Sequence, residues 1–371
     1  MRTTIEMCEG WRFWRSAEAE GEGEAVSVPH DAMLGEGRDA NAPSGGAGAY
    51  FEGGVYRYER EIVAPEGWCD ACVTLEFEGV YRNASVYLNG EKIAFNAYGY
   101  SGFYVCLDGA LRYGEKNVLA VVADNSKVPN SRWYSGSGIY RPVRLVVRPL
   151  RRIDLDGIAV RTVSIDPTGA EAAHVMVDVT HNAGEGAAVL VDIVRDGAQV
   201  ASAASGLGNT RPSASADERW VSSVEVAIPD ARLWSAEAPN LYECRIRLVE
   251  GDAAFGGDAV ADVTPLDEDC VTFGIRTLEW GPRGLLVNGR ETKLAGGCIH
   301  HDNGILGAID LDVASYRKIR IMKEWGYNAV RSAHNPMSKG MLRACDELGM
   351  YVMDELCDMW YENKNPFDYA L

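Results

Sequence analysis

The most constraining feature of this sequence is a change of pattern after residue 276. Before it, short runs of alternating apolar and polar residues predict strands. After it, residues 296–302, 328–331 and 350–354 predict strands separated by two helix patterns. Strands and helices that alternate with brief connections are typical of parallel β/α construction. A closed (β/α)8 TIM barrel needs about 250 residues, so we expect residues 277–371 to form its N-terminal, incomplete part.

Both helix patterns have recognisable ends. Gly326 and Gly349 stand where each helix is expected to stop, and Ser338 stands at the N-cap of the second. The first helix is expected over residues 312–325, with one apolar face formed by Val313, Tyr316, Ile319, Ile321, Met322 and Trp325.

The sequence before the barrel divides into two β-rich blocks. Residues 1–150 contain many short strand patterns, one of which leads into Asn89-Gly90, a dipeptide typical of hairpin turns. This block predicts a β-sandwich or a jelly roll. Residues 151–276 predict a separate immunoglobulin-like β-sandwich, in which the Ser-, Gly- and Ala-rich stretch 202–217 is expected to be a loop. Its strands are expected at 175–179, 188–194, 221–228 and 241–248.

Composition restricts the class of partner. A net charge of −18 over 371 residues argues against nucleic acid and anionic membranes, because phosphate binding needs clustered Lys and Arg. No run approaches the roughly 18 apolar residues of a membrane span, and the N-terminus lacks the apolar core of a signal peptide. We therefore expect a cytoplasmic protein that does not associate with membranes.

Nine cysteines are scattered along the chain, and two of them, Cys69 and Cys72, have CxxC spacing. No second CxxC follows and no nearby His completes a set of ligands, so neither a zinc nor a redox role is expected for this pair. Scattered cysteines in odd number are typical of free thiols in a reducing compartment.

Ionisable residues follow the predicted barrel strands. Active-site residues of such barrels lie at the C-terminal ends of the strands, so we expect a polar pocket here. A zinc site is the weaker interpretation, because adjacent His residues on a strand point to opposite faces and the sequence has no HExxH motif. We therefore predict no metal ligands in this pocket. The ionisable residues of the expected polar pocket are, strand by strand, His300, His301 and Asp302, then Arg331 and His334, then Asp354 and Glu355.

A second candidate lies in the first β-rich block. Asp124 ends a predicted strand, and the following loop, residues 132–141, carries Trp133 and Tyr134 among glycines. Aromatic rings and a carboxylate suit a sugar, whose CH faces stack on rings while its hydroxyls bond to carboxylates. Composition equally allows the two rings to plug the sandwich against its neighbour, and both interpretations stay open.

With these segments in place, the chain resembles glycoside hydrolase family 2, the group of β-galactosidases, β-glucuronidases and β-mannosidases. The similar segments occur in family order along the whole chain: residues 28–31, 132–141, 233–242, 273–276, 286–289, 328–336 and 345–355.

The resemblance implies hydrolysis of terminal β-glycosidic bonds by retaining double displacement. We expect β-galactosides as the substrates, and β-glucuronides and β-mannosides stay open. Such a mechanism uses an acid/base Glu, which follows an Asn in this family, and a nucleophile Glu, with the carboxyls about 5–5.5 Å apart. The chain contains no Asn-Glu dipeptide, and Glu355 stands on too early a strand to be either residue. We therefore expect both catalytic carboxylates beyond Leu371 and an inactive chain without them.

The resemblance also implies residues that bind the carbohydrate substrate. Two departures leave the exact sugar and any cation open: Ala333 replaces a Ser or Cys of many members, and Cys298-Ile299 replaces an Asn-Arg common in bacterial β-galactosidases. No cofactor is assigned, although the resemblance allows Na⁺ or Mg²⁺ and a homo-oligomer in the full-length enzyme. The alternative is a non-catalytic carbohydrate-binding or scaffold protein with a vestigial barrel. The expected substrate-binding residues are Asp124, His300, Arg331, His334 and Asp354.

Overall fold

The structure is a computed structural model that describes most of the chain. The described residues are 2–17, 21–166, 172–205, 209–214, 218–251, 263–282, 284–359 and 361–368. The chain forms two compact units. The first contains Met1–Thr3, Arg148–Leu294 and Asp346–Gly349, and the second contains Thr4–Val147, Ala295–Cys345 and Met350–Leu371.

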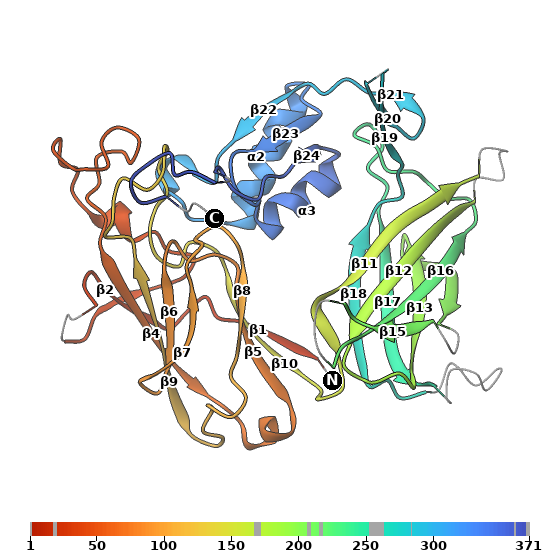
Figure 1. Ribbon diagram of the computed structural model, residues 1–371, viewed down its shortest axis with the longest axis horizontal. Coiled ribbons are helices and arrows are strands. Elements are labelled where there is room, and N and C mark those ends of the chain that lie inside the picture. The colour runs from red at the N-terminus through yellow and green to blue at the C-terminus, as the bar shows by residue number, and fades with distance from the viewer. Residues whose placement is uncertain are drawn as a thin grey trace. The chain divides into compact units, whose positions relative to one another are not determined.

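The larger part of the second unit is a β-sandwich of two antiparallel sheets (Figure 1). One sheet has the order β3 (Glu24–Val26), β2 (Trp11–Trp14), β4 (Val55–Val63), β9 (Lys116–Asp124), β6 (Ala84–Leu88) and β7 (Glu91–Asn96). The other has the order β1 (Thr3–Glu6), β10 (Val143–Arg148), β5 (Cys72–Phe77) and β8 (Phe103–Cys106). Two 3-10 turns, η1 (Ala32–Gly35) and η2 (Glu66–Asp70), complete it.

The core of this sandwich follows from the alternating pattern. In β6 and β9 every second residue is buried, which is the period of a strand with one face on a core. The buried side chains of both sheets form one cluster that includes Phe13, Leu75 and Val121. Asn89 and Gly90 both have positive φ and join β6 to β7, as the hairpin dipeptide predicted. The jelly-roll prediction is therefore confirmed.

The second unit also holds the start of the barrel. Strands β22 (Gly296–Ile299), β23 (Ala329–Ser332) and β24 (Tyr351–Met353) pair in parallel, in the order of the chain. Helix α2 (Asp312–Glu324) connects β22 to β23, and α3 (Lys339–Leu348) connects β23 to β24 (Figure 1). A 3-10 turn, η4 (Gly304–Leu306), precedes α2. The predicted strand–helix alternation is thus confirmed.

The helix ends agree with the sequence, but the apolar face of α2 does not. Ser338 Oγ accepts a hydrogen bond from Met341 N at 3.3 Å, as an N-cap does, and Gly326 and Gly349 have φ of 84° and 74°. The prediction of one packed apolar face on α2 was wrong. Ile319 is fully buried, whereas Val313 is 76% exposed, because the apolar residues of this helix are spread over more than one face.

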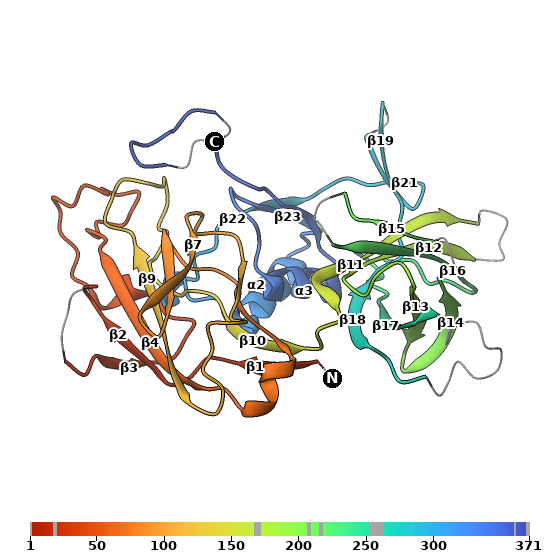
Figure 2. The ribbon, with the colours of Figure 1, turned by 60° about the horizontal axis from the view of Figure 1, so that its bottom comes forward.

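The first unit is mainly a second β-sandwich, whose two layers are separated in Figure 2. It has a buried cluster of its own, which includes Val177, Val191 and Ile246, and it confirms the immunoglobulin-like prediction. One sheet has the order β11 (Ile153–Ile165), β12 (Ala173–His181), β16 (Trp220–Ile228) and β15 (Thr210–Pro212). The other has the order β14 (Ala198–Ala204), β13 (Ala187–Arg195), β17 (Tyr242–Glu250) and β18 (Asp267–Phe273). A small sheet follows: β19 (Leu278–Gly281), β20 (Gly284–Val287) and β21 (Arg290–Glu291).

The stretch 202–217 is only partly the loop that its small residues predicted. Residues 202–204 end β14, which pairs with β13, and 210–212 form β15, which pairs with β16. These residues form strands because their backbones pair with neighbouring strands. Such pairing does not require the large or branched side chains by which a strand is recognised in a sequence. Residues 206–208 and 215–217 lie outside the described residues.

The helices of the described ranges are all too short or too polar to cross a membrane.

Candidate functional site

Three predicted site residues come together beyond the C-terminal ends of the barrel strands, around Glu355. Its carboxylate accepts a hydrogen bond from Arg331 Nε at 2.5 Å and lies 2.7 Å from His334 Nδ1. Arg331 is on β23, His334 follows that strand, and Glu355 follows β24. Since parallel strands end at the same edge of a sheet, their terminal side chains converge there. We call Arg331, His334 and Glu355 the strand-end triad.

The charges of the strand-end triad reinforce one another. Burial raises the pKa of Glu355, but hydrogen bonds from His334 and Arg331 outweigh it, so the pKa ends below its ordinary value. The hydrogen bond between Arg331 and Glu355 also raises the pKa of Arg331. Glu355 is therefore an ionised acceptor at neutral pH, and the proton between it and His334 lies on Nδ1. Nε2 of His334 takes no part in this hydrogen bond.

Two aromatic rings flank the strand-end triad. Trp133, from the jelly roll, stacks on His300 with ring centroids 5.2 Å apart and an interplanar angle of 26°. Its ring also lies 5.7 Å from that of His334. Trp133 Nε1 and His300 Nδ1 are buried and have no hydrogen-bond partner among the described residues. A buried donor without a partner costs about 1–3 kcal/mol, so these nitrogens mark a place where a polar ligand would be stabilised.

His301 faces different surroundings from its neighbour His300, as the alternation of side chains along a strand predicted. Its Nε2 lies 2.8 Å from the backbone oxygen of Ser135, and its ring packs edge-on against Tyr100 and Tyr140. Burial lowers the pKa of His301 to about 4. This His is therefore neutral at pH 7 and donates a structural hydrogen bond.

Asp31 fixes the jelly-roll loop that carries Trp133. Its carboxylate, 1% exposed, accepts hydrogen bonds from Tyr134 Oη at 2.6 Å and from Ala308 N, in the barrel, at 2.8 Å. It also accepts from Met33 N and Ser137 N, each at 3.1 Å. One buried group thus ties the loop to the segment before α2. We call Asp31 with these four donors the Asp31 network.

Glycine is required where the backbone approaches Asp31. Gly307 has φ of 60°, and a Cβ there would lie 2.4 Å from Asp31 Oδ2. Gly136 has φ of 65°, and a Cβ there would lie 2.5 Å from the Cβ of Ala308. Side chains at either position would be strained by the left-handed backbone and would displace the carboxylate.

A second ion pair connects the same loop to the segment after β24. Arg132 donates from Nε and Nη2 to the two carboxylate oxygens of Asp358, at 3.2 Å and 2.6 Å. Lys364 Nζ contacts the same carboxylate at 2.8 Å. Burial raises the pKa of Asp358, but the hydrogen bonds from Arg132 and Lys364 outweigh it and the pKa is lowered. Arg132, next to Trp133, is therefore held by a bidentate pair.

The remaining two predicted residues make local contacts. Asp354 Oδ1 accepts from Met337 N at 3.0 Å, which fixes the segment before α3. Asp124 Oδ1 accepts from Ser126 N and Oγ, at 3.0 Å and 2.6 Å, at the end of β9. In the described part of the chain, neither carboxylate has a hydrogen bond or ion pair with the strand-end triad. Their roles in substrate binding stay predictions.

Sequence reasoning missed part of this arrangement. The sequence places Glu355 in the expected polar pocket, but it gives no sign that Glu355 is the residue that holds Arg331 and His334. Trp133 suits either a sugar platform or a plug by its sequence, and its ring contacts with His300 and His334 are compatible with both interpretations. Two donors to Asp31 have no sequence signal, because they are backbone N–H groups distant in sequence, at Ser137 and Ala308.

Comparison with known proteins finds three family models that match successive parts of the chain. Residues 47–149 match the model "Glycosyl hydrolases family 2, sugar binding domain", 158–276 match "Glycosyl hydrolases family 2", and 281–365 match "Glycosyl hydrolases family 2, TIM barrel domain". All three matched models belong to one family, and they match in chain order.

Individual relatives extend over nearly the whole chain. A β-galactosidase of Bacteroides ovatus is 34% identical over 95% of this chain and 40% of its own length. A β-glucuronidase of Bacteroides fragilis is 26% identical over 96% of this chain and 50% of its own length. The chain thus spans half or less of the length of these relatives.

Solved structures agree with the fold. The crystal structure of a glycosyl hydrolase family 2 member from Bacteroides cellulosilyticus has a TM-score of 0.88 and 30% identity, over 99% of this chain and 47% of that one. A β-glycosidase from Bacteroides vulgatus has a TM-score of 0.85 and 28% identity, over 99% of this chain and 46% of that one. On these matches and the folds of its parts, the chain belongs to glycoside hydrolase family 2.

Proposed function

We propose that this chain supplies the substrate-side wall of a retaining glycosidase that hydrolyses terminal β-glycosidic bonds, with β-galactosides as its substrates. The observation that carries the proposal is the strand-end triad beside the Trp133–His300 stack. An aromatic wall next to fixed polar groups suits a sugar, which has both apolar CH faces and hydroxyls.

Within this proposal His334 is the residue that contacts the sugar. Its Nδ1 is engaged by Glu355 at 2.7 Å, so the imidazole is held in one orientation and one tautomer. In this proposal Nε2, the other ring nitrogen, forms the hydrogen bond with a sugar hydroxyl. Arg331 keeps Glu355 ionised, and Glu355 thereby positions His334 without touching the substrate.

Glu355 does not serve as either catalytic carboxylate in this proposal. A general acid has to be protonated at working pH, whereas the hydrogen bonds to Glu355 lower its pKa. A nucleophile needs an oxygen that reaches the anomeric carbon, whereas both oxygens of Glu355 accept hydrogen bonds. We therefore assign neither the acid/base nor the nucleophile to a residue of this chain, which has no Asn-Glu dipeptide.

The choice of β-galactosides rests on a comparison of identities. The β-galactosidase of Bacteroides ovatus is 34% identical to this chain, and the β-glucuronidase of Bacteroides fragilis is 26% identical. β-Glucuronides therefore form the second choice. Because the relatives are longer than this chain, the activity is proposed for the whole protein.

A direct experiment uses chromogenic β-galactoside, β-glucuronide and β-mannoside with the expressed 371-residue chain. We expect no turnover of any of them, and clear turnover would show that the carboxylates lie within the chain after all. The DNA that follows the codon for Leu371 is then read. A continuing frame that encodes an Asn-Glu and a second strand-end Glu supports the glycosidase, and a stop codon there would favour a carbohydrate-binding module.

A further inference from the structure

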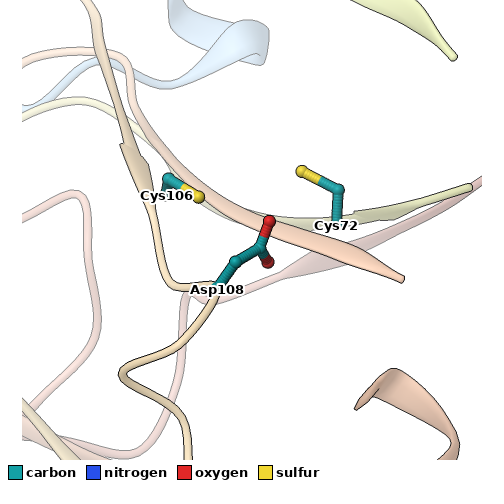
Figure 3. A group of neighbouring side chains, drawn as sticks. All are labelled: Cys72, Cys106 and Asp108. Atoms are coloured by element: carbon teal, nitrogen blue, oxygen red, sulfur yellow. The ribbon is translucent and has the colours of Figure 1, made fainter. Parts of the chain in front are cut away.

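The jelly roll brings three metal-binding side chains together at a place outside the strand-end triad. Cys72 begins β5, Cys106 ends β8, and Asp108 follows two residues later. Their sulfur and carboxylate ligand atoms all lie within 4.8 Å of one another. Figure 3 shows the three side chains directed toward a common space from two adjacent segments.

Strand register explains why these residues meet. Thr74 of β5 is the pairing partner of Cys106 in β8, so the next residues along the same face are Cys72 on one strand and Asp108 beyond the other. Alternate residues of a strand point to the same side, so all four side chains share one face. The spacing of Cys69 and Cys72 in the sequence suggested a different pair, yet the group that forms contains Cys72 without Cys69.

The backbone around Val73 holds this group in place. Leu107 N donates to Val73 O at 2.9 Å, and Val73 N donates to Asp108 Oδ1 at 2.7 Å. The second hydrogen bond orients the Asp108 carboxylate and leaves Oδ2 as the ligand atom. Hydrogen bonds that orient a ligand in this way are a regular feature of metal sites.

The charge of Asp108 is available to a cation. Within the described ranges, Asp108 has no ion pair with a Lys or Arg side chain. Cys72 is 2% exposed, whereas Cys106 and Asp108 are exposed, so the group is open to solvent from one side. A metal ion can therefore enter without any opening of the sandwich.

We propose that Cys72, Cys106 and Asp108 bind one Zn²⁺ ion or a similar thiophilic divalent cation. Two thiolates and one carboxylate are ligands that zinc accepts, and soft thiolates disfavour Mg²⁺ and Ca²⁺. Zinc sites of tetrahedral geometry have Zn–S distances of about 2.3 Å, which places two sulfurs nearly 4 Å apart. That spacing is compatible with the 4.8 Å limit of this group. Water completes the fourth position, and the two thiols release their protons on binding.

The proposed role is a clip at the edge of a sheet. β8 is the terminal strand of the order β1-β10-β5-β8, so among the strands that the structure describes it pairs with β5 alone. An ion bound by Cys72 on β5 and by Cys106 and Asp108 at the end of β8 joins the two segments. A ligand that binds the folded state alone raises the free energy of unfolding.

The test uses the whole chain, purified with a reductant, stripped with a chelator and dialysed against Zn²⁺ alone. We expect one zinc per chain by elemental analysis, and a thermal unfolding midpoint that rises with zinc concentration. Sulfur-to-metal charge-transfer absorption should appear when Cd²⁺ replaces Zn²⁺. X-ray absorption at the zinc edge of the unmutated chain should report two sulfur ligands, and a shell of oxygen alone would overturn the proposal.

Substitutions distinguish zinc binding at Cys72, Cys106 and Asp108 from zinc binding at the other cysteines. Asp108→Asn keeps an oxygen that can accept from Val73 N but loses the negative charge, and Cys106→Ser changes an exposed side chain. Each should weaken zinc binding by at least about tenfold, since even loss of a group that only orients a ligand costs about 10–100-fold. Cys69→Ser and Cys270→Ser are matched controls and should bind as the unmutated chain does.

Several outcomes would overturn the proposal. They are zinc binding that survives both Asp108→Asn and Cys106→Ser, binding that is lost in Cys69→Ser, and absence of equimolar zinc from the unmutated chain. A Cys72–Cys106 disulfide found by mass spectrometry in the reduced preparation would also exclude it. Chelated variants are compared by circular dichroism, so that loss of folding is not mistaken for loss of a ligand.

Discussion

The Asp31 network and the strand-end triad both connect distant segments, but they differ in how completely their polar atoms are satisfied. Asp31 is buried and accepts four hydrogen bonds, two of them from backbone N–H groups of the jelly roll and one from that of the barrel. The triad is partly exposed, and beside it Trp133 Nε1 and His300 Nδ1 have no partner among the described residues. A saturated network stabilises the fold, whereas an unsaturated one leaves hydrogen-bonding capacity for a ligand.

The largest change in the free energy of unfolding is expected from Asp31→Ala. It leaves buried donors without acceptors, and each such donor costs about 1–3 kcal/mol, so we expect a loss of roughly 3–5 kcal/mol in the free energy of unfolding. Urea unfolding followed by fluorescence measures it. Asp70→Ala, at an exposed carboxylate, is the matched control. A loss below about 1 kcal/mol would show that the Asp31 network does not hold the fold.

The next effect is a dependence of stability on pH that comes from His301. Its folded pKa is about 4, against about 6.5 for an unfolded His. Between these values the unfolded state binds a proton that the folded state does not, so stability falls as pH decreases from about 6.5 toward 4. The loss approaches about 3 kcal/mol by the end of that interval. His181 has a similar pKa, also about 4, and contributes in the same direction.

Comparison with the variant His301→Gln isolates this contribution. The variant should have a shallower decline of the urea midpoint between pH 7 and pH 4, because it lacks one titrating group. Parallel declines in the two proteins would contradict the assignment of His301 as a buried neutral side chain.

A smaller effect, on kcat/KM, is expected from a substitution in the strand-end triad. In the whole protein, His334→Ala should lower kcat/KM for a β-galactoside by about 100-fold, equivalent to about 2.7 kcal/mol, with little change in stability. His174→Ala, on the immunoglobulin-like sandwich, is the control and should leave activity unchanged. A loss of stability as large as that of Asp31→Ala would remove the distinction between the two regions.

The smallest effect is expected from Arg132→Met, which removes one of the two cations that pair with the Asp358 carboxylate. Lys364 keeps its contact with Asp358, and the Arg132 side chain lies largely in solvent, where an ion pair contributes about 0–1 kcal/mol, so the free energy of unfolding should change by no more than this. Loss of affinity for galactose without loss of stability would instead extend the binding region to Arg132. Urea unfolding and calorimetric titration with galactose distinguish these results.

Much of the architecture could be predicted because its signals are local. The period of two in β6 and β9, the Asn89-Gly90 turn, and the caps at Ser338 and Gly349 all depend on residues close in sequence. The order of strands and helices after residue 276 indicated where His300, Arg331 and His334 should lie. These predictions needed no knowledge of long-range contacts.

Tertiary structure decided which of those residues act together. Glu355 holds Arg331 and His334, whereas its neighbour Asp354 turns to Met337 N, and sequence could not separate two adjacent carboxylates. Cys72 meets Cys106 across a strand pair instead of Cys69 three residues away. The physical reason is the same in both cases. Local patterns determine the type of element and the face of each side chain, but partners distant in sequence are chosen by strand register and by the packing of loops against strand ends.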